Sequence, residues 1–132
     1  CSDGVKKNGV PTAHPTGMVN FPINIIPDHE HLYHAERTPI WVKEWQKRYQ
    51  WSDDFGPDSY YVEEWTELVL QGLQKNLKEG RVSNLILHPI TMYLCDQFKA
   101  TEHIFEFISQ YPTLWMNEVE LGAISPQKVK VA

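Results

Sequence analysis

A short apolar run that follows a helical pattern constrains the fold of this chain most. Residues 83–88 read SNLILH; they come after Gly80, which closes the helical pattern, and before Pro89. A run of this length is typical of a buried strand and too short for a buried helix. Glycine after a helix and proline after a strand are the expected breaks. These residues therefore predict a core strand.

The rest of the chain alternates between strand and helix patterns. Thr38 and Pro39 fit the N-cap and the first position of a helix. Pro22 lies in an apolar stretch at 18–26 and places that expected strand towards a sheet edge. Such alternation predicts an α/β fold with mainly parallel strands, although three strands are too few to close a barrel. In chain order, the expected elements are a strand at 18–26, a helix at 38–49, a helix from 58 or 59 to about 77, the strand at 83–88, a helix at 101–110 and a strand that begins at 114.

The charge of the chain disfavours two classes of partner. The formal net charge is −5, so neither nucleic acid nor an anionic membrane surface is an expected partner. No run of 18 apolar residues is present, so no membrane span is expected.

The two cysteines, Cys1 and Cys95, do not make a disulfide framework, and the compartment stays open. An N-terminal cysteine such as Cys1 can be an amide-cleaving nucleophile, but the stacked antiparallel sheets of that fold need more strands than are expected here. Cys95 has apolar neighbours, and we expect a buried, inert thiol.

His88 ends the predicted strand at 83–88 and is the first candidate for chemistry. The carboxyl ends of strands are where α/β folds place their active sites. Alternation along a strand puts Ile86 on the same side as His88, which suits a pocket for a small methyl-bearing group. The alternative is a strand-end histidine that bonds to a backbone carbonyl.

A polar loop at 27–37 holds a second candidate cluster. Its residues Asp28, His29, His31 and His34 are spaced so that they can converge on one ion, and imidazole and carboxylate are good zinc ligands. Three interpretations remain open: the histidines bind metal, with His29 and His31 as ligands; they contact substrate, with His34 as the candidate; or they have no role. A position after a strand favours a functional loop.

Residues 85–120 read LILHPITMYLCDQFKATEHIFEFISQYPTLWMNEVE. Their order and spacing resemble the closing block of polysaccharide deacetylases of the NodB type, which are carbohydrate esterases: a strand with Leu-His-Pro, a helix, and a short strand with an aromatic residue. Residues 1–4, CSDG, resemble the turn of the family's preceding motif, and residues 17–22, GMVNFP, resemble the strand after it. The resemblance covers most of the chain, and the Leu-His-Pro block is its strongest part.

The resemblance implies that residues 1–132 are a single domain, the C-terminal half of a (β/α) barrel of polysaccharide-deacetylase type with mainly parallel strands. The implied activity is hydrolysis of an N-acetyl group on a carbohydrate, with a divalent metal, zinc, that activates water. By the match, His88 is the general acid that protonates the leaving amine, Ile86 belongs to the acetate pocket, and Asp3 orients the site.

The family's metal-binding Asp, its His-x-x-x-His motif and its catalytic base have no match in this chain. We therefore expect most metal ligands to lie outside the chain, in a complementary N-terminal chain or segment. The alternative is a catalytically degenerate deacetylase fold that binds carbohydrate or pairs with a partner.

Trp51 lies in an expected loop and is the best candidate for stacking against a sugar. The tryptophans on the expected helices, Trp41, Trp45 and Trp65, are expected to pack inside the protein.

Overall fold

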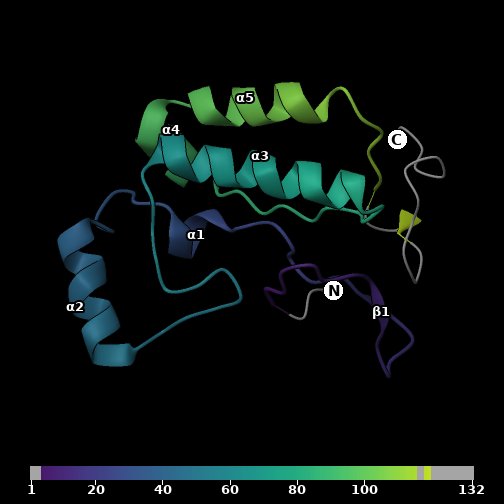
Figure 1. The fold of residues 1–132 in the computed structure, drawn as a ribbon, viewed down its shortest axis with the longest axis horizontal. Helices are drawn as coiled ribbons and strands as arrows, with labels where there is room; N and C mark the ends of the chain where they lie inside the picture. The colour runs from purple at the N-terminus through teal and green to yellow at the C-terminus, as the bar shows by residue number, and fades with distance from the viewer. Residues whose placement is uncertain (1–3, 116–117, 120–132) are drawn as a thin grey trace.

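The computed structural model of the chain describes residues 4–115 and 118–119. Figure 1 shows a layer of helices above an irregular, mostly extended N-terminal half. In chain order, the elements are β1 (Thr12–Ala13), β2 (Val19–Asn20), α1 (Asp28–His31), α2 (Pro39–Tyr49), α3 (Val62–Lys78), α4 (Pro89–Asp96) and α5 (Lys99–Ile108).

The core lies beneath α3 and α5, which run side by side in the same direction (Figure 1). Trp65 and Val69 of α3 and Ile104 of α5 are fully buried. The indole nitrogen of Trp65 donates to the carbonyl of Pro27, 3.2 Å away, which ties α3 to the segment before α1. The amphipathic pattern predicted for this helix is confirmed, because its apolar face is the one that is buried.

The helix predicted at 38–49 is confirmed as α2. The Thr38 hydroxyl accepts the backbone N–H of Trp41 at 3.2 Å, and Pro39 is the first helical residue. The helix ends at Gln50, which has the left-handed conformation, with φ at 51°. Val42 is the buried residue of α2, and Figure 1 shows this helix apart from the α3–α5 layer. Most of α2 therefore faces outward.

The prediction of an α/β fold, part of a (β/α) barrel with mainly parallel strands, is wrong. In the part of the chain that the structure describes, the only sheet is the antiparallel pair of β1 and β2, with Thr12 opposite Asn20. Residues 83–88 are extended but belong to no strand, and only Val19–Asn20 of the predicted strand 18–26 is one. Leu114 and Trp115 are irregular, and Met116 lies outside the described residues.

Side-chain amides explain why the two predicted strands form no ladder. The segments around Asn24 and Asn84 lie next to each other and share one backbone bond, from Asn24 N to Asn84 O at 3.3 Å. The backbone N–H of Asn84 donates instead to the Asn24 carboxamide at 2.8 Å, and the Asn24 amide donates to the Val82 carbonyl at 2.8 Å. Side chains thus take the places of backbone partners that a strand would need.

Two helices were not predicted. The first is α1, a single turn inside the expected polar loop 27–37. The second is α4, which begins directly after His88 with Pro89 at its first position. Two predicted helices begin at other residues than expected. Helix α3 begins at Val62 without a side-chain cap, and α5 begins at Lys99. The expected cap at 58 or 59 is therefore wrong by one turn.

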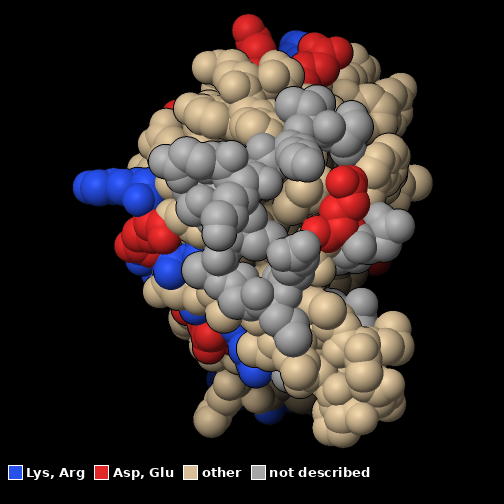
Figure 2. Space-filling view, turned by 90° about the vertical axis from the view of Figure 1, so that its right-hand side faces the viewer, with Lys and Arg blue, Asp and Glu red and all other residues tan. Residues whose placement is uncertain are grey.

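On the face shown in Figure 2, acidic and basic side chains occur together among the uncharged residues that the structure describes, and no large basic patch stands out among them. Among the described helices, none combines the length and apolar character that a membrane crossing requires.

Candidate functional site

The strongest candidate site is formed by His88 and Asp28, which are 60 positions apart in the sequence. Asp28 is the first residue of α1, and His88 ends the extended segment that precedes α4. One carboxylate oxygen of Asp28 lies 2.6 Å from Nδ1 of His88, and the other accepts the backbone N–H of His88 at 2.6 Å. A single carboxylate therefore holds both the ring and the backbone of His88.

Burial differs sharply across this pair. The Asp28 side chain is completely buried, whereas 44% of the His88 side chain is exposed. A carboxylate only accepts hydrogen bonds, so Nδ1 of His88 is the donor, and Nε2 is left facing away. Among the described residues, Nε2 of His88 has no hydrogen-bond partner. This arrangement fixes the tautomer of an imidazole and leaves its other nitrogen available for proton transfer.

Two further histidines lie beside this pair. The His29 ring centroid is 5.5 Å from that of His88 and 5.9 Å from that of His34. Nε2 of His34 lies 3.1 Å from the His29 carbonyl, to which it donates. His29 is exposed and His34 is half-buried. The structure thus brings together the loop histidines 29 and 34 and the predicted acid His88.

His31 lies apart from this group. Its ring is completely buried, with Nε2 2.8 Å from Asp53 Oδ2 and Nδ1 2.7 Å from the Asp58 carbonyl. Both ring nitrogens are occupied by protein groups, so the ring joins α1 to the loop at 50–60. Such a histidine is held in place and has no free nitrogen to offer to a metal ion.

The described residues do not fit the implied metal by themselves. Within residues 4–115 and 118–119, no three His, Cys, Asp or Glu side chains are arranged to hold an ion. Of the two predicted ligands, His29 is exposed and His31 has both nitrogens bonded. The prediction that most ligands lie outside this chain is not tested by these residues.

The remaining predicted site residues have different surroundings. Leu85 and Leu87 pack against the core, whereas Ile86 is half-buried and is not among the described residues that pack there. Trp51 is half-buried, and its ring lies 5.7 Å from that of His31. Asp3 lies outside the described residues. The substrate roles of Ile86 and Trp51 stay predictions.

Asp28 was the most important residue that sequence reasoning did not place. It was grouped with the loop histidines as a possible metal ligand, yet its carboxylate bonds to His88. One sequence signal could have found it: Asp28 follows the apolar run 18–26, just as His88 ends the run 83–88. Polar residues at the ends of two adjacent extended segments are candidates for one site.

Three groups near the site have raised pKa values. Burial raises the pKa of the Cys95 thiol, and the charges of Asp96 and Asp28 add to the effect. Burial likewise raises the pKa of the hydroxyls of Tyr33 and Tyr60. The Cys95 thiol donates to the Tyr33 carbonyl at 3.5 Å. Cys95 is half-buried rather than fully buried as predicted, and its raised pKa fits the prediction of an unreactive thiol, since the thiolate is the nucleophile.

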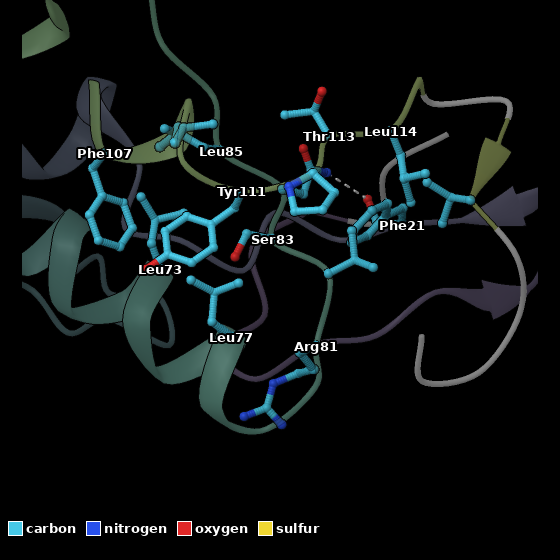
Figure 3. Close-up of a pocket in the computed structure, with 15 residues that line it drawn as sticks. Phe21, Leu73, Leu77, Arg81, Ser83, Leu85, Phe107, Tyr111, Thr113 and Leu114 are labelled. Carbon is cyan, nitrogen blue, oxygen red and sulfur yellow. Dashed lines mark hydrogen bonds between the residues drawn. The ribbon is translucent and has the colours of Figure 1, made fainter. Parts of the chain in front are cut away.

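An apolar cavity lies elsewhere, at the C-terminal ends of α3 and α5. Its volume is about 330 Å³, and Figure 3 shows Leu73, Leu77, Phe107 and Tyr111 around it. Arg81 is the charged residue of its lining, which includes neither His88 nor Asp28. The described lining of this cavity includes no paired acid and base, so the His88–Asp28 pair remains the stronger candidate site.

The chain was compared with protein families, with curated proteins and with solved structures, and no match was found. The resemblance to polysaccharide deacetylases therefore rests on the sequence segments alone.

Proposed function

We propose that this chain supplies the general acid for hydrolysis of an N-acetyl group on a carbohydrate. The observation that supports the proposal best is the His88–Asp28 pair, in which a buried carboxylate holds a half-exposed imidazole at 2.6 Å. An amide nitrogen is a poor leaving group until it is protonated, and an oriented imidazolium can provide that proton.

The proposed step uses His88 and Asp28 in separate roles. Asp28 accepts the N–H at Nδ1, holds the ring in one orientation and stabilises the positive charge of the imidazolium. Once water has added to the acetyl carbonyl carbon, the proton on Nε2 moves to the amide nitrogen as the C–N bond breaks, and the products are acetate and a free amine. Ile86, which is half-buried two residues before His88, provides an apolar wall for the acetyl methyl group in this proposal.

The proposal needs groups beyond those described. The water-activating base and most ligands of a divalent metal, zinc, belong to a complementary N-terminal chain or segment. The step assigned to His88 does not depend on them for its geometry, because Asp28 positions the ring from within this chain.

Exposed aromatic side chains favour a second candidate function. Trp41 is 44% exposed and Tyr49 is 59% exposed on α2. Flat apolar rings at a surface suit the C–H faces of sugars. The second candidate is therefore a module that binds carbohydrate without turnover.

Acetate release from an N-acetylated oligosaccharide distinguishes the two candidates. The measurement uses the chain together with the segment that supplies the base. We expect release by the native protein, loss in His88→Ala, and no loss in His103→Ala, which removes an exposed histidine of α5 that has no hydrogen bond to His88 or Asp28. Equal release by the two variants would refute the acid role. Sugar binding without any release would favour the second candidate.

A further inference from the structure

A row of aromatic rings runs along α2 and into the loop after it. Trp41, Trp45 and Tyr49 are four residues apart, so they lie on one face of the helix. The rings of Trp41 and Trp45 are stacked, with centroids 5.8 Å apart and an angle of 13° between their planes. The Trp45 centroid is 6.0 Å from that of Tyr49 and 5.4 Å from that of Trp51. We call these four residues the aromatic row.

Arg37 contacts two rings of the aromatic row. Its guanidinium carbon lies 5.3 Å from the Trp41 centroid and 5.4 Å from the Trp45 centroid, within range of a cation–π contact. The same guanidinium donates to the Ser59 hydroxyl at 3.1 Å and to the Glu30 carbonyl at 2.5 Å. Arg37 is only 9% exposed, and its hydrogen bonds hold the guanidinium in one position. The guanidinium in turn restrains the rings of Trp41 and Trp45. A surface that is ordered in advance loses little entropy on binding.

Charged side chains of both signs lie beside the aromatic row on α2, namely Glu44, Lys47 and Arg48. The central part of a protein–protein interface is depleted of such residues, which argues against a partner protein. Rings flanked by acid, amine and guanidinium groups suit a ligand with apolar C–H faces and many hydroxyls.

We infer that the aromatic row is a binding subsite for a stretch of carbohydrate chain away from the reacting sugar. The sugar itself is inferred from the proposed function, whereas the subsite follows from the row. The row ends at Trp51, whose ring is 5.7 Å from His31 of α1, the same short helix that carries Asp28. Four rings in a row can contact more than one sugar unit of a polymer at the same time. The consequence is a preference for long chains over single sugars.

The test is calorimetric titration of the 132-residue chain with the hexamer of N-acetylglucosamine and with the monomer. Trp41→Leu keeps an apolar side chain but removes the ring, and Phe105→Ala is the matched control, because Phe105 is a 55% exposed aromatic residue of α5. We expect Trp41→Leu to weaken hexamer binding about tenfold or more, the usual effect of losing one stacking ring. Monomer affinity and the Phe105→Ala variant should be unaffected. Tyr49→Ala provides a second ring deletion if the first variant unfolds.

Three outcomes would overturn the subsite. The native chain binds no hexamer; Trp41→Leu binds it as well as the native chain does; or Trp41→Leu changes only the oligomeric state in analytical ultracentrifugation, which would make the row a contact between copies. Hexamer binding that needs Trp41, together with no acetate release by the assembled protein, would support the subsite while refuting the proposed hydrolysis.

Discussion

Two histidine–aspartate pairs meet at the single turn of α1, and they differ in what surrounds them. His31 pairs with Asp53 at 2.8 Å, and His88 pairs with Asp28 at 2.6 Å. The His31 ring is completely buried, and its second nitrogen bonds to a backbone carbonyl. The His88 ring is 44% exposed, and its second nitrogen has no partner among the described residues.

This difference separates a structural pair from one that is suited to chemistry. Proton transfer needs a nitrogen that can reach a ligand, and of the two paired histidines His88 has one and His31 does not. A ring with both nitrogens bonded holds two segments together, which is what His31 does for α1 and the loop at 50–60. The same two residue types therefore serve opposite purposes, and exposure decides which. The predictions below test this assignment from each side.

The largest effect is expected for His88→Ala. In the assembled enzyme, the turnover of an N-acetylated oligosaccharide should fall by about 10² to 10⁴-fold, because the acid is lost. KM should change much less, since the proton is transferred only in the transition state. The chain should stay folded, because the Asp28 carboxylate keeps its bond to the backbone N–H at position 88 and water can replace the exposed ring.

The matched substitution His31→Ala should act on stability. It removes a fully buried ring, and the Asp58 carbonyl and one oxygen of the Asp53 carboxylate lose their bond to that ring, whereas the other oxygen keeps the Phe55 N–H. We expect the free energy of unfolding to fall by about 2–4 kcal/mol, as for the loss of a buried hydrogen-bonded group. Urea unfolding of the chain measures it. A variant as stable as the native chain would show that the pair does not hold the loop.

The two carboxylates sharpen the comparison. The substitution Asp28→Asn keeps the shape of the side chain but replaces one acceptor oxygen with an NH₂ group. That group then faces a donor of His88, either the ring N–H or the backbone N–H. Turnover should fall by about tenfold or more, since the ring loses its fixed tautomer. Asp53→Asn should cost about 1 kcal/mol of stability and leave turnover unchanged. Equal kinetic effects of the two variants would argue that neither carboxylate has a special role in catalysis.

The sequence predicted local structure well and pairing poorly. The helix at 38–49 was predictable because Thr38 and Pro39 specify its start within a few residues. The helix with Trp65 on its apolar face was predictable from periodicity. The absence of a ladder between the two predicted strands was not predictable. Asn24 and Asn84 bond through side chains across 60 positions, and no local sequence pattern indicates such a contact.

The candidate site was half predictable for the same reason. His88 stood out through its place at the end of an apolar run, and the loop histidines stood out through their spacing. Which histidine pairs with which carboxylate depends on contacts between distant segments: Asp28 with His88, and Asp53 with His31. The prediction that Trp41 packs inside failed because α2 has little of the protein against it, and Trp41 is 44% exposed.

The smallest effect is expected at Cys95, close to the His88–Asp28 side of the comparison. Burial raises the pKa of this thiol, and the negative charges of Asp96 and Asp28 add to the effect. At pH 8 the thiol of the folded chain should therefore be mostly protonated and should react slowly with iodoacetamide, because the thiolate is the reactive form. Unfolding in urea restores the ordinary pKa and access, so the alkylation rate of the Cys95 peptide, followed by mass spectrometry, should rise about tenfold or more. Asp96→Asn removes one of the two charges and should speed alkylation of the folded chain modestly. A thiol that reacts equally fast in the folded and unfolded chain would show that the surroundings of Asp28 are open to solvent. That result would contradict the description of Asp28 as a buried carboxylate beside an exposed imidazole.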